Sequence, residues 1–424
     1  MKKIFSIILV FVLVSMSLPL KSFAKDKSNT TNYKNYLVEI YDTKTYKNIK
    51  SQYSQNIINS FRESNKNKHT MVMSLSKDKY NIFKENKNSI AIEEDIYFKA
   101  ESTGINEIDD ILTNTLGNQE QETYSEEYPS NIKMVKGTSR QTSHENNNDN
   151  TVKVAILDSG ISNHSELNIA KHVSLLDDKW YDNCGIHYDI TGHGTSIAGI
   201  IGAKENDNGI IGICEGIDLY SIQVLDANNS APLSRIVEGI DWAIENDIDV
   251  LNMSFGTNTN SQILHNAIIR ANQNGMVLVA AAGNTTSNTQ YPARYPEVIS
   301  VGSVDGSGNI SDFSADDEFV DIYAPGEGII TTGLFNGYIA AEGTSLATPH
   351  VTAAAAIIKS LDESKNASNI KNLIVASSYR ISENSNVAIL DIENMINHFS
   401  CFYESENEEL CINNNSLDEY NEDV

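Results

Sequence analysis

One short segment, together with the apolar run that follows it, constrains the fold of this chain most strongly. The segment is GTSLATPH at residues 343–350, and the run occupies residues 351–358. The run predicts a buried helix that begins close to Ser345. A helix N-terminus offers unpaired N–H groups and partial positive charge to a developing oxyanion, and small neighbours let a substrate backbone approach. A capped core helix is the alternative interpretation, because Ser and Thr are common N-caps.

Two upstream motifs add chemistry to this serine. The sequence VAILDSGI at residues 154–161 predicts a buried parallel strand that ends at Asp158, where α/β sheets place their sites. The sequence DITGHGTSIAG at residues 189–199 places His193 at the start of a helix of small residues. Taken singly, the aspartate could be a turn residue and the histidine a core residue. Together, Asp158, His193 and Ser345 provide an orienting acid, a base and a nucleophile.

A fourth motif completes the set. Residues 276–284, MVLVAAAGN, predict a strand that ends at Asn284, whose amide can donate to the oxyanion of a tetrahedral intermediate. With these four motifs, over about residues 128–398, the chain resembles the subtilisin-like serine proteases (subtilases, peptidase family S8), which share the order Asp, His, Ser. The resemblance implies an α/β fold: a subtilisin-like parallel sheet with helices on both faces, preceded by a small α+β prodomain.

Alternating strand and helix patterns support that fold class. Strands are expected at residues 152–157, 218–224, 250–254, 277–281 and 298–301, and helices at residues 194–202, 234–246, 261–274 and 367–376. A further segment, residues 390–398, is expected to close the domain.

Further residues are assigned to the substrate cleft by the resemblance. Ser254, Phe255 and Gly256 stand where the family pairs a strand with the substrate backbone, although they could equally form an ordinary strand end. Thr285, Gln290 and Arg294 are the candidates for the primary pocket. Arg294 could instead belong only to a rigid, proline-rich loop.

The N-terminal region has the features of a secretory signal. Basic residues 2–3 precede an apolar run at residues 4–20, and small residues stand at Ser22 and Ala24. This pattern predicts a signal peptide over residues 1–24 and a secreted, extracellular protein; a membrane anchor is the alternative. The net charge of −26 disfavours nucleic acid and anionic membranes as partners.

Residues 25–101 are expected to form a separate α+β domain. Strand patterns at residues 36–41, 70–75 and 89–100 alternate with helix patterns at residues 46–61 and 77–84. The order resembles the subtilase prodomain, which assists folding and blocks the cleft; an unrelated small binding domain is the alternative. We further expect a flexible linker at residues 102–127, the catalytic domain at residues 128–398 and an acidic tail at residues 399–424. The resemblance predicts self-cleavage after Glu101, with cuts after Glu122 or Glu126 as alternatives.

The sequence also makes predictions about cysteine pairing and metal binding. The four cysteines favour the pairs Cys184–Cys214 and Cys401–Cys411, and free buried thiols are the alternative. In the resembled family a longer calcium loop follows the histidine helix. Residues 206–213 are short, and Glu166 stands where the family often has a calcium-binding Asp. No cofactor and no metal ligands are therefore assigned, and a strong calcium site at this loop is not expected.

These features predict a secreted, self-processing serine endopeptidase, a monomer whose partners are a peptide or protein substrate and its own prodomain. The acidic composition, the short loop and Leu346, in place of the Met of many relatives, resemble the secreted subtilases that remove leader peptides from lanthipeptide bacteriocins or cytolysins. A broad-specificity extracellular nutritional protease is the first alternative. A catalytically inert subtilase-fold binding protein is the second.

Overall fold

The computed structural model describes residues 33–61, 68–101, 103–107, 129–137, 140–141, 151–176, 189–207, 209–286, 288–380 and 387–404. Its N-terminal unit is a four-stranded antiparallel sheet in the order β2-β3-β1-β4. The strands are β1 (Tyr33–Ile40), β2 (Ile57–Ser60), β3 (His69–Ser76) and β4 (Ile90–Glu94), and the helices are α1 (Thr43–Gln52) and α2 (Lys77–Glu85). The expected signal peptide, most of the expected linker and most of the acidic tail lie outside the described residues.

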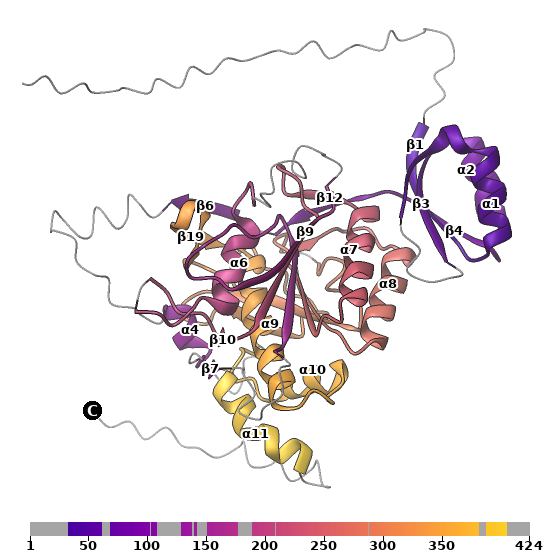
Figure 1. The fold of residues 1–424 in the computed structure, drawn as a ribbon. Helices are drawn as coiled ribbons and strands as arrows, with labels where there is room; N and C mark the ends of the chain where they lie inside the picture. Colours follow the sequence, from indigo (N-terminus) through magenta and orange to yellow (C-terminus); the bar gives the residue numbers. More distant parts are fainter. Residues whose placement is uncertain are drawn as a thin grey trace, which may run out of the picture.

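The two faces of this small sheet bury different partners. Val38 and Met73 belong to the core that the sheet shares with α1 and α2. Leu37 and Val72, one position along each strand, belong to a core shared with the large domain. Because side chains alternate between the faces of a strand, the sheet packs its own helices on one side and the large domain on the other (Figure 1).

One predicted helix in this unit is too long. The pattern indicated a helix over residues 46–61, but α1 ends at Gln52 and is followed by a short 3-10 turn, η1 (Ser54–Asn56), and by β2. Strand β2 pairs with β3, with Ile57 opposite Met73. The strand edge of β3 satisfies the backbone of this segment, so tertiary pairing overrides the local helical pattern.

The large domain is built on a seven-stranded sheet in the order β17-β16-β15-β13-β8-β11-β9, with every pair parallel. Its strands are β8 (Lys153–Asp158), β9 (Ile169–Ser174), β11 (Asp218–Gln223), β13 (Val250–Met253), β15 (Val277–Ala281), β16 (Val298–Val304) and β17 (Ile322–Pro325). The predicted α/β class is confirmed. Strands β9 and β17 at the two sheet edges were not predicted.

Helices cover both faces of this sheet (Figure 1). Helices α6 (His193–Gly202), α9 (Thr344–Leu361) and α10 (Ala367–Ala376) contribute to the core on one face. Helices α7 (Leu233–Glu245) and α8 (Gln262–Gln273) contribute to the core on the other. Parallel strands buried on both faces read as nearly continuous apolar runs, which is why the sequence identified the central strands.

Smaller elements complete the domain. These are α4 (Ser130–Met134), the paired strands β7 (Arg140–Gln141) and β10 (Cys214–Glu215), the 3-10 turn η2 (Leu334–Asn336) and α11 (Ile392–Glu404). Ile132 of α4 and the adjacent Val135 are buried in the core that α6, α9 and α10 form on one face of the sheet. Helix α11 begins near the predicted position and runs past it. Within the part of the chain that the structure describes, none of the helices is long and apolar enough to cross a membrane.

The chain crosses from the N-terminal unit over the large domain in two strands (Figure 1). Strand β5 (Tyr97–Ala100) lies between β12 (Ser230–Pro232) and β14 (Phe255–Gly256). Strand β6 (Thr103–Glu107) pairs with β19 (Tyr338–Glu342), which also pairs with β18 (Ile329–Thr332). The prediction of a flexible linker over residues 102–127 is wrong at residues 103–107, which form β6 because the edge of β19 supplies their backbone with a partner.

Candidate active site

The four residues of the predicted catalytic set lie where elements begin or end. Asp158 is the last residue of β8, and His193 is the first residue of α6. Ser345 is the second residue of α9, and Asn284 follows β15 in a tight turn at Gly283, whose φ is 114°. Because all strands of the sheet are parallel, Asp158 and Asn284 both lie where the carboxyl ends of the strands meet, which is the usual position for sites in such sheets.

Asp158 and His193 form a buried pair. Their side chains are 0% and 1% exposed, and His193 Nδ1 lies 2.7 Å from Asp158 Oδ1. Burial by itself would lower the pKa of His193. The Asp158 charge and hydrogen bond, with smaller contributions from Asp189 and Glu101, raise the pKa above its ordinary value. The Nε2 atom of His193 is buried and has no hydrogen-bond partner among the described residues, so it is available to a reacting group.

A second buried carboxylate, Asp189, fixes the segment that carries the histidine. Its Oδ1 accepts hydrogen bonds from Gly192 N (2.9 Å) and Ser159 Oγ (2.8 Å), and its Oδ2 accepts from Thr195 N (2.9 Å). The N-cap residue of α6 is Gly192, which has no side chain to cap the helix, so Asp189 replaces it. Burial raises the pKa of Asp189. This role was not predicted, because Asp189 lies four residues before the first helical residue and not at the N-cap position itself.

The helix that carries Ser345 contains a proline, and the surrounding residues compensate for it. Pro349 has no N–H to donate to the Ser345 carbonyl four residues earlier. Ser254 Oγ donates to that carbonyl instead, at 3.0 Å. Ser345 Oγ lies 3.4 Å from the carbonyl oxygen of Ser254. The end of β13 thus holds the start of α9 in place.

One donor reaches the carbonyl oxygen of Glu101, and the amide of Asn284 is held in a fixed orientation at the turn after β15. Ser345 N–H donates to the Glu101 carbonyl oxygen at 3.0 Å. The Oδ1 atom of Asn284 accepts from Thr344 N (3.0 Å) and Thr344 Oγ1 (2.8 Å), which fixes the plane of its amide. The Nδ2 atom of Asn284 is buried and has no partner in the described part of the chain. It is a preorganised donor that needs no reorganisation when negative charge develops beside it.

The residues before Glu101 occupy the cleft as an extended strand. Phe255 and Gly256 of β14 pair with Ala100 and Lys99 of β5. Glu101 N–H donates to the carbonyl oxygen of Ser254 at 3.2 Å. The structure therefore brings the three predicted cleft residues, Ser254, Phe255 and Gly256, against the backbone that leads to Ser345.

The Glu101 side chain is held in a pocket next to the nucleophile. It is 8% exposed, and its Oε2 accepts a hydrogen bond from Asn284 N–H at 2.9 Å. Burial raises the pKa of Glu101 to about 7, although the Asn284 hydrogen bond and the His193 charge act in the opposite direction. Gln290 packs against the same wall: a Cβ placed on Gly256 would lie 2.1 Å from Gln290 Oε1. Thr285, by contrast, is exposed.

The hypothesis that Arg294 partners the Glu101 carboxylate is wrong. The Arg294 guanidinium lies over the Phe319 ring, 4.1 Å from its centroid, and its charge acts on Asp317. Within the described residues, Glu101 forms no ion pair with any Lys or Arg. Stacking on an aromatic face satisfies a guanidinium that the sequence alone could not place.

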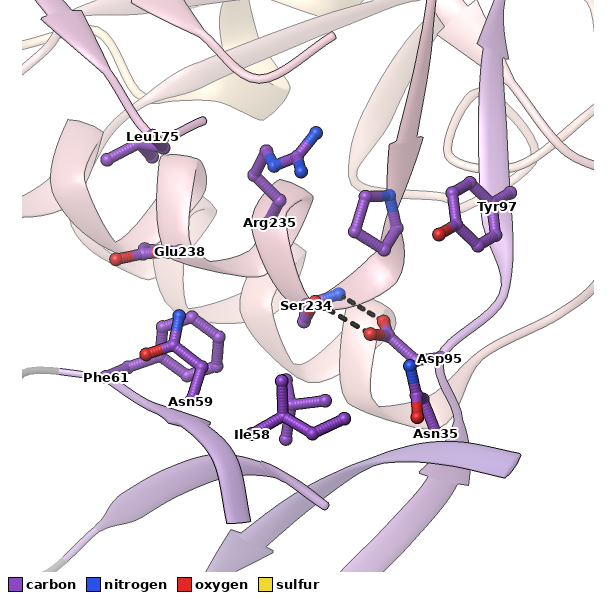
Figure 2. Close-up of a pocket in the computed structure, with 12 residues that line it drawn as sticks. Asn35, Ile58, Asn59, Phe61, Asp95, Tyr97, Leu175, Ser234, Arg235 and Glu238 are labelled. Carbon is purple, nitrogen blue, oxygen red and sulfur yellow. Dashed lines mark hydrogen bonds between the residues drawn. The ribbon is translucent and has the colours of Figure 1, made fainter. Parts of the chain in front are cut away.

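Two carboxylates of the N-terminal unit cap helices of the large domain, an arrangement that was not predicted from the sequence. Asp95 accepts hydrogen bonds from Ser234 N (2.8 Å) and Ser234 Oγ (2.9 Å) at the start of α7 (Figure 2). Glu93 accepts from Ser261 Oγ (2.5 Å) and Gln262 N (2.9 Å) at the start of α8. The N-cap residue of α7 is Pro232, which makes no side-chain cap, so Asp95 supplies the missing acceptor.

The pocket drawn in Figure 2 lies at this contact between the two units. Its lining comes from both sides of the contact: Asn35, Ile58, Asn59, Phe61, Val72, Asp95 and Tyr97 on one side, and Leu175, Pro232, Ser234, Arg235 and Glu238 on the other. It contains none of the four residues of the catalytic set. We therefore assign it to the seam between the units.

The predicted disulfide Cys184–Cys214 is wrong in this structure. Cys214 is a free, buried thiol whose Sγ donates to the carbonyl oxygen of Ala353 at 3.2 Å. Burial raises the pKa of this thiol well above its ordinary value, so it behaves as a small core residue. Cys184 and Cys411 lie outside the described residues, and so does the side chain of Cys401.

The comparisons with known proteins agree with this geometry. The profile of the subtilase family matches residues 149–400. The chain is 42% identical over 212 residues to a thermostable alkaline protease of Halalkalibacterium halodurans (50% of this chain and 57% of that protein). It is 39% identical over 227 residues to subtilisin DY of Bacillus licheniformis (52% and 81%). It is 41% identical over 213 residues to the minor extracellular protease Epr of Bacillus subtilis (50% and 32%). The match thus spans 57% or less of the length of two of these relatives.

A parallel sheet flanked by helices, with Asp158, His193 and Ser345 at the carboxyl ends of its strands, defines a protein of the serine-hydrolase type. The chain belongs to the subtilase family.

Proposed function

We propose that this protein is a subtilisin-like serine endopeptidase that cuts its own chain between Glu101 and Ser102. The observation that carries the proposal is the hydrogen bond from Ser345 N–H to the Glu101 carbonyl oxygen, with Asn284 Nδ2 buried and unpartnered nearby. Strand β5 leads up to the bond and β6 leads away from it, so the uncut chain lies through the site as a substrate does.

The chemistry follows from the residues present. His193 Nε2 takes the proton of Ser345 Oγ, and Oγ attacks the carbonyl carbon of Glu101. The resulting oxyanion is stabilised by Ser345 N–H and Asn284 Nδ2. Protonated His193 returns the proton to the leaving nitrogen of Ser102, and water then hydrolyses the acyl-enzyme. Asp158 holds the imidazole tautomer and stabilises its charged form; the 2.7 Å contact supports this role.

We infer that residues 25–101 act as an inhibitory prodomain after the cut. The new C-terminus at Glu101 retains the backbone pairing of β5 with β12 and β14, and Glu93 and Asp95 retain their helix caps. Together with the apolar contact through Leu37 and Val72, these interactions keep the cleft filled until the prodomain dissociates or is degraded.

We further propose that the protein is secreted and that its substrate is the leader of a lanthipeptide, bacteriocin or cytolysin precursor. Secretion is supported by the signal-like N-terminus and by the relative described as a minor extracellular protease. Leader removal is supported by the sequence features given above and by the burial of the Glu101 side chain beside the nucleophile, which favours cutting at few sites. The names of the relatives, among them an alkaline protease and an alkaline elastase, favour the second candidate, a broad-specificity nutritional protease.

Two experiments test these proposals. The Ser345→Ala chain should remain uncut and inactive, whereas the control Ser307→Ala, in an exposed turn, should process normally. A purified Ser345→Ala protein that still cuts a good substrate would disprove the assignment of Ser345 as the nucleophile. An unmodified chain that stays uncut and is not labelled by a fluorophosphonate probe would instead support the inert binding protein. Casein digestion, measured beside a panel of leader peptides, separates the two substrate candidates: rapid general digestion of casein would contradict the leader peptidase.

We propose that the loop at residues 206–213 does not bind calcium tightly. Glu166 Oε1 accepts a hydrogen bond from Tyr338 OH at 2.8 Å, and its Oε2 accepts from Asn206 Nδ2 at 3.3 Å. An amide N–H group directed at the carboxylate is the reverse of the oxygen donors that calcium requires. Within the residues that the structure describes, no group of three or more His, Cys, Asp or Glu side chains could hold a metal.

A further inference from the structure

We propose that the primary pocket is uncharged and that it accepts glutamine as readily as protonated glutamic acid before the scissile bond. The inference rests on the proposed cut after Glu101 and defines the substrate class of that site. The preferred side chain is a neutral carboxylic acid or carboxamide of the length of glutamate.

The hydrogen-bonding of Glu101 gives the first reason. Its carboxyl group is buried, and its one hydrogen-bond donor in the described part of the chain is the backbone N–H of Asn284, at 2.9 Å from Oε2. A backbone N–H can donate to the carbonyl oxygen of an acid or an amide as well as to a carboxylate. A pocket selective for the ionised form needs a cation or several donors to offset the loss of hydration.

The wall of the pocket gives the second reason. Gln290 is 5% exposed and packs against two glycines: a Cβ on Gly283 would lie 2.9 Å from its Cγ, and a Cβ on Gly256 would lie 2.1 Å from its Oε1. Gly256 pairs with β5, and Asn284, the residue after Gly283, donates to the Glu101 side chain. The Oε1 atom of Gln290 is buried without a hydrogen-bond partner among the described residues. This unpartnered acceptor lies beside Gly256, which pairs with β5, so an occupant that carries a donor there would satisfy it. An acid O–H or an amide N–H2 is such a donor, and a carboxylate has none.

The charges around the pocket give the third reason. The residues that contact Glu101 from the position after β13, the turn after β15 and the start of α9 are Ser254, Asn284 and Ser345, none of which ionises near neutral pH. From α6, His193 is the titratable group whose charge acts on Glu101. During attack on the substrate, His193 must begin neutral, so it does not supply a standing positive charge.

The pH dependence follows with a definite sign. Burial moves the pKa of this carboxyl from its ordinary value of 4.5 to about 7. Binding of a glutamate side chain therefore takes up a proton between these values. The affinity for a substrate with glutamate at this position is greatest below the pKa of the free side chain. It falls about tenfold per pH unit up to the pKa of the bound side chain and is constant above that value. A glutamine side chain has no such dependence.

The test compares two peptides that differ only in the side chain at position 101, which is glutamate in one and glutamine in the other. The sequences are YFKAESTGINE, which is residues 97–107, and the same peptide with glutamine at position 101. The self-processed enzyme, released from its prodomain, is assayed with each peptide from pH 5 to pH 9, and kcat/KM for the glutamine peptide is divided by kcat/KM for the glutamate peptide. Titration of His193 and of the shared side chains cancels in this ratio.

We expect the ratio to rise about tenfold per pH unit below pH 7 and to level off above pH 7, with glutamine cut at least as fast as glutamate there. A ratio that stays below 0.1 and does not change with pH would overturn the inference, while cleavage of the glutamate peptide would still support the cut after Glu101. Failure to cut either peptide would overturn both, because the inference rests on that site.

Two variants sharpen the result. Gln290→Lys should place a cation at the wall, reverse the preference toward glutamate and flatten the ratio. Arg294→Gln is the matched control, since Arg294 stacks on Phe319 and should leave the ratio unchanged. If Arg294→Gln alone abolishes cleavage after glutamate and leaves cleavage after glutamine intact, the pocket is charged and the inference is wrong. The peptide comparison on the unmodified enzyme decides the question even if the Lys variant does not fold.

Discussion

Replacing Asp95 by alanine should weaken the hold of the prodomain on the catalytic domain. Asp95 accepts two hydrogen bonds from Ser234 at the N-terminus of α7, a helix whose own N-cap residue, Pro232, provides no side-chain acceptor. The change leaves an N–H group and a hydroxyl without their partner and removes a negative charge from the positive end of the helix dipole.

The size of the effect can be estimated from these contacts. Loss of a capping side chain costs about 1 kcal/mol and at most about 2 kcal/mol. The charge at the helix end contributes part of that total and is weakened by salt. Because about 1.4 kcal/mol corresponds to a factor of ten, the dissociation constant of the prodomain should rise roughly 5- to 30-fold.

The assay measures release of the prodomain by dilution. Self-processed enzyme is diluted serially, and activity on a small peptide is followed to find the concentration at which half of the activity appears. The matched control is Glu94→Ala, which removes the neighbouring carboxylate. Glu94 pairs with Lys34 within the prodomain and is exposed, so its loss should leave the midpoint unchanged. Equal midpoints for both variants and the unmodified chain would refute the capping explanation.

Three further predictions follow from the site and the core. Asn284→Ala should lower kcat by about 10²–10³, or about 2.7–4 kcal/mol, the loss known for the corresponding donor of subtilisin itself, with KM little changed; a loss below tenfold in kinetic assays would exclude Asn284 as the donor. Excess EDTA should leave the thermal midpoint and the activity nearly unchanged, because the oxygens of Glu166 are engaged by hydrogen-bond donors; a large drop that calcium restores would contradict this. Cys214→Ala should destabilise the protein by about 1 kcal/mol in urea unfolding, since a buried thiol is lost. A loss of 2–5 kcal/mol would instead point to a broken disulfide.

The sequence predicted the central architecture because the signals there are local. The parallel strands are continuous apolar runs, and the helix starts at His193 and Thr344 are marked by glycines and small residues. Residues 277–281 and 367–376 were predicted with the bounds that β15 and α10 have. In each of these cases the backbone partner of the segment lies in the regular sheet or within the same helix.

The misses share a physical cause: they depend on contacts between distant segments. Strand β6 has no apolar pattern, and it forms because the edge of β19 is free to pair with it. The end of α1 at Gln52 is set by pairing of β2 with β3. Arg294 could in principle pair with the Glu101 carboxylate or stack on an aromatic ring, and only the folded chain brings the Phe319 ring to it. Cys214 is buried against Ala353, a position that spacing alone does not reveal.

The caps at Glu93 and Asp95 illustrate the same limit in the functional interface. In the sequence alone, nothing distinguishes either residue from the many other acidic residues of the chain. Each becomes informative only when the helix N-termini at Ser234 and Gln262 are placed beside it. The helix was predicted to begin at Ser234, a common cap residue, so the sequence did not indicate that α7 has no side-chain cap of its own.

The most direct test of the proposed self-cleavage is the N-terminal sequence of the processed enzyme, supported by the intact mass of both fragments. The chain should be expressed and allowed to process without added protease, beside the Ser345→Ala chain as the uncut control. A mature chain that begins at Ser102, with a released fragment that ends at Glu101, is the predicted result. A first cut after Glu122 or Glu126, or after a leucine or phenylalanine, would contradict the central claim that the Glu101 carbonyl is held for attack by Ser345.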